Sequence, residues 1–380
     1  MDLSFSEPEQ TFRREVRSWL AAHQPAEPLP SMDTAEGFEA HRRWERELFD
    51  ERYSVVSWPA EYGGRGASIT EWLIFEEEYW AAGAPGRVSQ NGINLLAPSI
   101  LDHGTAEQKA RFLPAMASGE QIWAQAWSEP EAGSDLAALR STAVRAPSGD
   151  GWLLSGQKTW SSRAAFADWG FGLFRTDPAA ERHRGLTSFL FPLTAPGVTV
   201  RPIPQFDGEP GFAELFLDGV HVPDADVLGA VGDGWKVTMA TAGKERGLYL
   251  RSPGRFLATA RRLRALWESA GRPPAFRDRV ADAWIGARAY QLATFETAAR
   301  IADGGTLGVE TSVNKLFWSE LDLAMHETAL DLLGPEAEHL DSAWMDGYLF
   351  ALAGPIYAGT NEIQRNVVAE RVLGMPRGTR

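Results

Sequence analysis

Residues 121–135 read QIWAQAWSEPEAGSD, and they mark the point where the pattern of the chain changes. A short run of β-forming residues ends here in a turn that contains Pro, Gly, Ser and Asp. Further short runs of the same kind follow at residues 152–154, 171–175, 188–193, 198–203 and 213–222. Turn residues separate these runs, and such spacing favours an antiparallel barrel or sandwich over β–α–β units.

The sequence on both sides of these runs has a helical pattern. Before them, Phe12, Val16 and Leu20 fall on one helical face behind a capping-box pattern. After them come long Ala-, Leu- and Arg-rich runs and a last helix expected at 360–373. We therefore predict an α+β multi-domain chain. Its expected parts are an N-terminal helical domain, a middle β domain and a C-terminal helical bundle, at residues 1–120, 121–232 and 233–380.

Composition excludes several classes of function. The chain contains no cysteine, which rules out disulfides, cysteine-ligated zinc, iron–sulfur clusters and thiol catalysis. Its formal net charge of −14 makes it a poor nonspecific ligand for nucleic acid or an anionic membrane. The histidines show no spaced metal pair, and no apolar run is long enough to span a bilayer. The acidic first residues, interrupted by Pro8, do not read as a secretory signal, so we expect a cytoplasmic enzyme without a metal.

Three irregular stretches carry the residues best suited to chemistry. The turn at 125–135 can present hydroxyls and backbone N–H groups to a polar ring edge or a phosphate, although a plain surface loop is the alternative. GQKTWSS at 156–162 places a tryptophan either in the core or against a planar cofactor. IYAGTNEIQR at 356–365 offers free N–H groups at a helix start, or is simply a helix capped by Thr360.

Together these stretches resemble the acyl-CoA dehydrogenase family, and they occur in the family's order over nearly the whole chain. The matching segments are WPAEYGG at 58–64, WSEPEAGSD at 127–135, LSGQKTWSS at 154–162, LDGVHVP at 217–223 and IYAGTNEIQR at 356–365. The resemblance implies an N-terminal helical domain, a middle antiparallel β-barrel domain and a C-terminal four-helix bundle. It also implies FAD as cofactor, an acyl-CoA as substrate and an electron-transfer flavoprotein as electron acceptor.

The resemblance assigns cofactor and substrate positions residue by residue. Trp160 matches the tryptophan that covers one flavin face, and Ser162 matches the hydroxyl residue near the reactive ring nitrogen. Glu362 stands where relatives often have Gln. The full set of matched FAD positions is Gln125, Trp127, Ser128, Gly133, Ser134, Trp160, Ser162, Thr360 and Glu362. The matched substrate-side positions are Ser134, Arg246, Tyr357 and Gly359.

The implied reaction converts an acyl-CoA thioester into a trans-2-enoyl-CoA. A base removes the pro-R α-proton while a β-hydride passes to the flavin. Many relatives carry the catalytic Glu immediately before the Gly–Thr pair, where this chain has Ala358, which keeps only its backbone N–H for the substrate carbonyl. A minority places the base on another helix before an Arg, and Glu245 matches that position. We expect Glu245 to be the base, with its pKa raised by burial; a surface Glu paired with an Arg is the alternative.

A second departure concerns the adenosine end of FAD. The family's Arg-x-x-Phe-Gly segment, which contacts FAD across a subunit interface, is absent, since residues 268–276 read ESAGRPPAF. Residues 332–338, LLGPEAE, replace the downstream Gly-Gly-x-Gly. The chain thus either binds FAD through altered contacts or forms half of a hetero-oligomer.

Two other functions stay open beside the dehydrogenase. The chain could be a catalytically silent partner subunit, or a flavin oxidase or monooxygenase acting on a non-CoA substrate. Heteromeric members of the family are associated with bulky acyl chains such as steroid side-chain CoA esters. The sequence leaves the acyl chain, the physiological acceptor and the choice between a homo- and a hetero-oligomer, dimer or tetramer, undecided.

Overall fold

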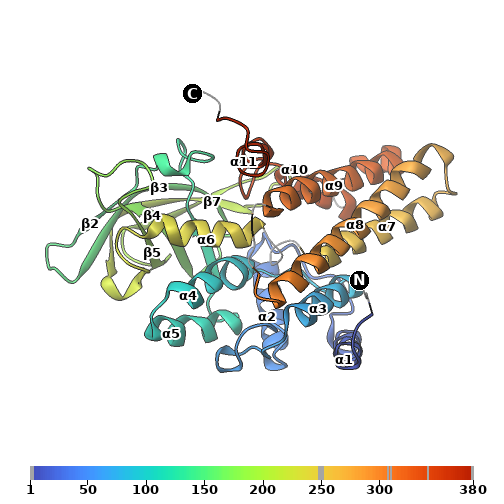
Figure 1. Ribbon diagram of the computed structural model, residues 1–380, viewed down its shortest axis with the longest axis horizontal. Coiled ribbons are helices and arrows are strands. Elements are labelled where there is room, and N and C mark those ends of the chain that lie inside the picture. Colours follow the sequence, from blue (N-terminus) through green and yellow to red (C-terminus); the bar gives the residue numbers. More distant parts are fainter. Residues whose placement is uncertain (1–3, 247–251, 306–307, 309, 340–341, 378–380) are drawn as a thin grey trace. The chain divides into compact units, whose positions relative to one another are not determined.

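The computed structural model describes residues 4–246, 252–305, 308, 310–339 and 342–377, without the side chains of residues 242–246 (Figure 1). The chain folds into two units, and neither unit is one continuous stretch of the sequence. The helical unit takes Met1–Ala26, Ala67–Ala84 and Glu245–Arg380, and the sheet unit takes Glu27–Gly66 and Pro85–Lys244. The N-terminal third is therefore shared between the units, and the boundaries after residues 120 and 232 stay a prediction.

Several helices of the helical unit begin with a side-chain cap. α1 (Glu7–His23) starts after Ser6, whose hydroxyl and backbone N–H exchange hydrogen bonds with Glu9, so the predicted capping box is confirmed. The other helices of this unit are α3 (Ile69–Ala82), α7 (Pro253–Ser269), α8 (Arg277–Ala302), α9 (Glu310–Leu333), α10 (Ala343–Ala353) and α11 (Asn361–Val367).

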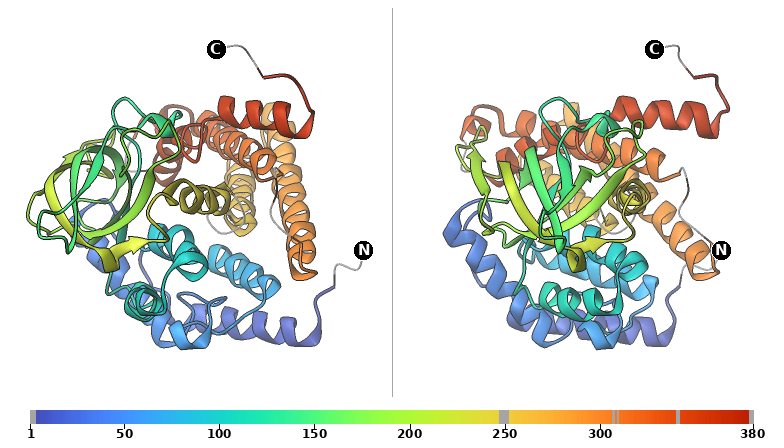
Figure 2. Two further views of the ribbon diagram at one scale, coloured as in Figure 1. Left: turned by 60° about the vertical axis from the view of Figure 1, so that its left-hand side comes forward. Right: turned by 90° about the vertical axis from the view of Figure 1, so that its left-hand side faces the viewer.

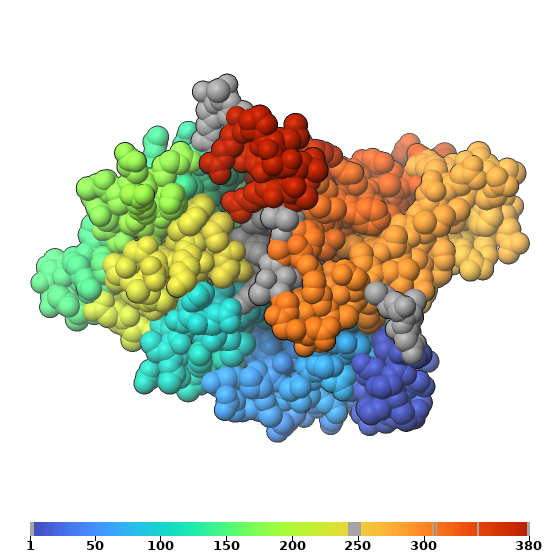
Figure 3. All heavy atoms as spheres, in the orientation of Figure 1, coloured from blue at the N-terminus to red at the C-terminus, as the bar shows by residue number. Residues whose placement is uncertain are grey.

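Helices α7, α8 and α9 pack on one another around a single apolar core. Its largest buried side chains include Phe256, Tyr290 and Trp318. α3 packs on α7 and also on α1, so two helices from the start of the chain join this C-terminal core. In the space-filling view, the side chains of α7 and α8 (orange) cover one side of the helical unit (Figure 3).

The sheet unit contains its own helices around the strands. They are α2 (Ala35–Asp50), a π-helical stretch at Asn91–Leu96, α4 (Ala97–His103), α5 (Ala106–Ala117) and α6 (Gly234–Arg246), whose last two residues are counted with the helical unit. α5 begins with a capping box formed by Thr105 and Gln108, two residues whose types and spacing are those of the motif. α6 is tied to α4 by a 2.6 Å hydrogen bond between the buried hydroxyls of Ser99 and Thr241.

The sheet is curved and is formed by every strand of the described residues (Figure 2). Its strand order is β6-β7-β3-β2-β4-β5-β8, and β1 pairs with β4 outside this path. The strands are β1 (Trp123–Ala126), β2 (Thr142–Arg145), β3 (Gly151–Ser162), β4 (Trp169–Arg175), β5 (Leu186–Pro192), β6 (Val198–Ile203), β7 (Phe212–Pro223) and β8 (Val227–Leu228).

The expectation of a closed antiparallel barrel is wrong. β6 and β8 stand at opposite ends of the strand order, and no ladder joins them in the described part of the chain. β8 has only two residues before the chain passes through a turn into α6, so no strand is left to close the sheet. Nor is the pairing wholly antiparallel, because β4 runs parallel to both β1 and β2.

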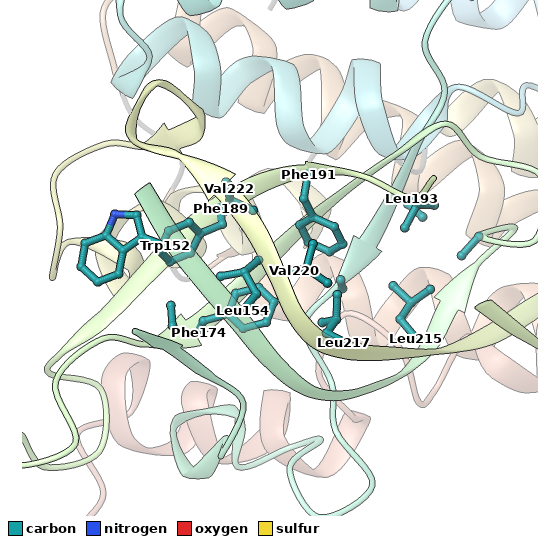
Figure 4. Packing of buried hydrophobic residues seen from close by; sticks show 14 of the residues in the cluster. Trp152, Leu154, Phe174, Phe189, Phe191, Leu193, Leu215, Leu217, Val220 and Val222 are labelled. Carbon is teal, nitrogen blue, oxygen red and sulfur yellow. The ribbon is translucent and has the colours of Figure 1, made fainter. Parts of the chain in front are cut away.

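One face of the sheet carries the core of this unit (Figure 4). Phe189 and Phe191 of β5 meet Phe174 of β4 in edge-to-face ring contacts. Leu154, Leu215 and Val220 from β3 and β7 complete the cluster and are fully buried. This packing fixes β3 and β4, the two strands that flank the candidate site.

Candidate functional site

The turn after β1 is closed by backbone hydrogen bonds. Glu129 and Ala132 exchange two bonds of 3.0 Å, and the backbone N–H of Thr159 on β3 donates to the carbonyl of Ser128 at 2.9 Å. The Glu129 carboxylate accepts hydrogen bonds from the backbone N–H groups of Arg140 at 2.6 Å and Ser141 at 2.9 Å. The turn is thereby fixed both to β3 and to the segment that leads into β2.

A buried ammonium group lies behind this turn. Lys158 of β3 is fully buried, and its Nζ donates to Glu129 Oε1 at 2.8 Å, to the carbonyl of Leu173 at 2.8 Å and to the carbonyl of Trp127 at 3.3 Å. Burial lowers the pKa of Lys158 to about 8, against the opposing effect of Glu129. Burial raises the pKa of Glu129, but Lys158 and the hydrogen bonds outweigh it, so that pKa lies below its ordinary value.

Trp160 sits at an irregularity in β3. The pairing of β3 with β7 shifts register between Lys158 and Ser161, and Trp160 has a φ of +60°. Positive φ is unfavourable for a bulky residue and is characteristic of functional sites when the surrounding structure imposes it. Lys158 and Ser161 are fully buried, whereas Trp160 is 60% exposed. Its ring makes an edge contact with Phe212, at 5.9 Å between the two ring centroids. The bulge therefore turns a large planar face outward.

Two buried donors near this turn fit a planar cofactor such as FAD. Gln125 Nε2 and Trp127 Nε1 are inaccessible to solvent and have no hydrogen-bond partner among the described residues. Leaving such donors unpaired costs free energy, and an acceptor-bearing ligand would satisfy them. A flavin ring edge carries suitable acceptors. Gly133 and Ser134 lie exposed farther along the same turn.

A second candidate segment lies in the helical unit, before α11. Ala358 has a φ of +57° and Gly359 a φ of +81°, which is why a glycine follows the alanine here. Gln364 Nε2 donates to the carbonyls of both residues, at 3.1 and 3.3 Å. The backbone N–H of Ala358 donates to no group among the described residues. Thr360 caps α11 by accepting from the backbone N–H of Ile363, as its predicted capping role requires.

A second buried lysine anchors this segment. Lys315 of α9 is fully buried and donates to Asn361 Oδ1 at 2.7 Å, and the Ser319 hydroxyl donates to the same oxygen at 3.1 Å. Asn361 is the first residue of α11, so the start of this helix is held from α9. Glu362 beside it is exposed, and hydrogen bonds to the backbone and to Thr360 lower its pKa.

The structure places the predicted residues in two groups. Gln125, Trp127, Ser128, Gly133, Ser134, Trp160 and Ser162 belong to the sheet unit, and Tyr357, Ala358, Gly359, Thr360 and Glu362 belong to the helical unit. Within the first group, the turn and β3 are joined directly by hydrogen bonds. The ring of Tyr357 stacks on Trp318 at 5.8 Å, so it packs against the helical core.

The predicted base lies outside the residues whose side chains are described. Glu245 and Arg246 form the last residues of α6, and only their backbone is described. The described residues contain no group of three His, Asp or Glu side chains arranged to hold a metal ion. None of the described helices is long and apolar enough to cross a membrane.

Sequence reasoning missed the two buried lysines and their partners. Lys158 stands between strand-forming residues in GQKTWSS, and Lys315 interrupts an apolar helix in SVNKLFW. A single lysine within a run of residues expected to be buried could have indicated these sites, because lysines are buried only when they have partners.

The open sheet with its outward tryptophan and the helices that follow it define an acyl-CoA dehydrogenase-like α+β fold. The chain belongs to the acyl-CoA dehydrogenase family. Its residues 6–120, 124–220 and 232–373 match the family's N-terminal, middle and C-terminal domain models. It is an enzyme of this family, with helical N- and C-terminal parts and a sheet in the middle.

The similar proteins include several of mycobacterial origin. The chain is 41% identical to the acyl-CoA dehydrogenase IpdE1 of Mycobacterium tuberculosis, over 97% of this chain and 98% of that protein. The structure of the Tcur3481-Tcur3483 steroid ACAD is similar over the full length of both chains, with a TM-score of 0.88 and 28% identity. The ChsE4-ChsE5 complex from Mycobacterium tuberculosis matches over the full length with a TM-score of 0.84 and 30% identity.

Proposed function

We propose that the chain is an FAD-dependent dehydrogenase that converts an acyl-CoA thioester into a trans-2-enoyl-CoA. The observation that carries this proposal is the pair of unpaired buried donors, Gln125 Nε2 and Trp127 Nε1, together with the exposed ring of Trp160 on β3, the strand to which the same turn is hydrogen-bonded. When bound, FAD supplies the acceptor for the two electrons and the β-hydrogen of the substrate. The residues proposed to hold it are Gln125, Trp127, Ser128, Gly133, Ser134, Trp160, Ser162, Thr360 and Glu362.

The proposed roles of the protein groups follow from the charge that develops on the substrate. Removal of an α-proton places negative charge on the thioester oxygen, which a fixed backbone donor stabilises. The N–H of Ala358 is such a donor, because none of the described residues accepts from it. Ala358 has no carboxyl group, so the proton must go to another residue, and we assign that role to Glu245.

The proposed substrate is a CoA ester with a bulky acyl chain of the steroid type. This choice is supported by one of the similar structures, which is that of a steroid ACAD. The proposed electron acceptor, an electron-transfer flavoprotein, rests on the family resemblance. The chain could instead be a catalytically silent partner, which Ala358 and the missing Arg-x-x-Phe-Gly segment favour, since two of the similar structures each name two different chains.

The first test is an anaerobic visible spectrum of the purified chain before and after short, branched and steroid-type acyl-CoAs are added. Bleaching of the flavin band by one class of substrate supports dehydrogenation and identifies that class. A yellow protein that no acyl-CoA bleaches, but that oxygen rapidly reoxidises after chemical reduction, favours the oxidase or monooxygenase alternative. A colourless protein that turns yellow only with a related chain favours the silent partner.

The base assignment predicts the behaviour of Glu245→Gln. This variant keeps the shape of the side chain but cannot accept the proton, so we expect bound flavin and a rate of substrate-dependent bleaching reduced by about 10²- to 10⁴-fold. Stopped-flow absorbance measures this rate. The matched control is Glu47→Gln on α2, an exposed residue, which should bleach at the wild-type rate. Wild-type bleaching by Glu245→Gln would refute the assignment.

A further inference from the structure

The turn at residues 127–135 holds its shape through a small number of strong contacts. Its tip is exposed at Glu131, Gly133 and Ser134, so packing does not fix it there. The backbone bonds between Glu129 and Ala132 close the turn, but they do not attach it to the sheet. Attachment comes from the Thr159–Ser128 backbone bond, from the contacts of Glu129 and Lys158, and from the ion pair of Asp135 with Arg182 at the far end of the turn. The position of the 127–129 end of the turn therefore depends on the Lys158–Glu129 pair together with one backbone bond.

Lys158 joins three parts of the sheet unit through one nitrogen atom. Its Nζ contacts Trp127 and Glu129 of the turn and the carbonyl of Leu173 on β4. The nitrogen also lies 4.8 Å from the ring centre of Phe174, so the cation faces an aromatic ring as well. The ammonium group thus links the turn to β4 through hydrogen bonds.

The same lysine lies two residues before Trp160 in β3. Thr159 between them donates its N–H to the turn, and the register shift that exposes Trp160 begins at Lys158. Moving Lys158 would therefore displace both the turn that carries the unpaired Trp127 Nε1 and the bulge that turns Trp160 outward.

A buried ion pair contributes little net free energy to the stability of a core. Apolar side chains of the same volume often stabilise a fold as well or better, because two buried charges lose their hydration. Phe174, whose ring faces the Lys158 ammonium group, belongs to the apolar cluster of the sheet unit. What the pair adds is a fixed orientation, since the bonds of Lys158 to Trp127, Glu129 and Leu173 hold two atoms of the turn relative to β4.

We propose that Lys158 and Glu129 are positioning residues that set the flavin-binding conformation of the 127–135 turn and of Trp160. This inference rests on the proposed function. Neither residue needs to touch the cofactor, because both act through Trp127 and through the β3 bulge. Their loss should change how FAD is held more than it changes whether the chain folds.

The test uses two variants and a matched control. Lys158→Met removes the ammonium group, and Glu129→Gln keeps the shape of the carboxylate but removes its charge. Leu154→Ala is the control, because Leu154 is a fully buried residue of the same strand and belongs to the apolar cluster rather than to the turn. For each protein, FAD dissociation constants of the deflavinated chain, the bound flavin spectrum and the melting temperature are measured.

We expect both positioning variants to weaken FAD binding by about tenfold to a hundredfold, the effect of losing a hydrogen bond to a charged group. Their flavin absorption bands should also shift toward those of free FAD. Leu154→Ala should lower the melting temperature while its folded fraction binds FAD with the wild-type constant. If Lys158→Met does not fold, Glu129→Gln decides the question, because it is isosteric.

Wild-type FAD affinity and an unchanged flavin spectrum in a folded Glu129→Gln variant would overturn the inference. Equal weakening by Leu154→Ala would also overturn it, because the effect would then be general destabilisation. If the wild-type chain binds no FAD, with or without a related chain, the proposed function itself fails, and this result is separate from any comparison of variants.

Discussion

The ammonium group of one residue, Lys158, loses its proton within the pH range of ordinary experiments. Its pKa of about 8 is set by burial, whereas Glu129, the charged group bonded to it, stays ionised because its own pKa is lowered. Loss of the proton leaves Nζ with two N–H donors for three acceptors. The carbonyl of Trp127, at 3.3 Å, has the longest of the three hydrogen bonds and should be released first.

This titration predicts opposite effects of pH on stability and on FAD binding. The unfolded chain keeps its lysine protons to about pH 10, so between about pH 8 and 10 it binds more protons than the folded chain. The contribution of Lys158 to the free energy of unfolding therefore rises with pH in this window, while release of Trp127 weakens FAD binding. Urea unfolding and FAD titration from about pH 7 to about pH 9 measure the two trends. Lys158→Met should lack both, and a wild-type FAD affinity that is flat across this range would contradict the prediction.

At the scale of elements, the β3 strand depends on a glycine. Gly156 has a φ of +145°, and a Cβ atom there would lie 2.2 Å from Ser141 Oγ and 2.8 Å from its Cα. A register shift of β3 against β7 occurs at the same place, between Leu154 and Gly156. The glycine therefore allows β3 to bend past the segment that leads into β2.

The consequence is a sharp prediction for Gly156→Ala. We expect the free energy of unfolding to fall by about 1–3 kcal/mol, because the side chain both strains the backbone and overpacks against Ser141. Urea denaturation followed by circular dichroism measures this change. Gly133→Ala is the matched control, since a Cβ there meets nothing within 4 Å, and its stability should change by less than about 0.5 kcal/mol. Equal stability of the two variants would contradict the packing argument.

Local features of the elements could be predicted, whereas features set by distant pairing could not. The capping boxes of α1 and α5 depend on residues three apart, and both were predictable from the sequence. The prediction of a barrel was wrong, because closure of the sheet depends on whether the first and last strands of the strand order pair with each other. The exposure of Trp160 depends on its register against β7, so the residues around it could not decide between a place in the core and a place against a planar cofactor.

The candidate site likewise has parts that could be predicted from the sequence and parts that could not. The segments at 125–135, 156–162 and 356–365 were found through their residue types and order. The buried contacts of Lys158 with Glu129 and of Lys315 with Asn361 join residues 29 and 46 positions apart. No local pattern encodes such distances, so these anchors became visible only in the folded chain.

For the whole molecule, the exposed apolar side chains of α8 and α9 bear on assembly. Ile285 and Leu292 lie one heptad apart on α8, and Val313 and Phe317 lie one turn apart on α9. Phe317 packs beside α8, where its ring stacks on Tyr290 at 6.2 Å. Exposed apolar side chains on two helices that pack together are typical of subunit interfaces, and two of the similar structures each name two chains.

We therefore expect this α8–α9 surface to be covered by a second subunit of the same fold. Ile285→Asp combined with Leu292→Asp should reduce the mass of the assembly to that of the single chain, because two charges would be buried without partners. Sedimentation velocity of the chain, alone and with a related subunit, measures the mass. Phe206→Asp is the control at an 89% exposed position in the sheet unit, and it should leave the mass unchanged. An assembly that survives the double substitution would exclude this surface.

The open sheet has a consequence for how the protein behaves at high concentration. A sheet that does not close ends in a strand whose outer backbone groups could pair with another molecule, which is a common route to aggregation. β6 is such a terminal strand, and it carries Pro202, which has no N–H to offer, beside Arg201, whose guanidinium is paired with Glu214 of β7. Proline and charge are the devices by which natural sheets discourage edge-to-edge growth. The chain thus leaves its sheet open and protects the exposed edge through the choice of two adjacent residues.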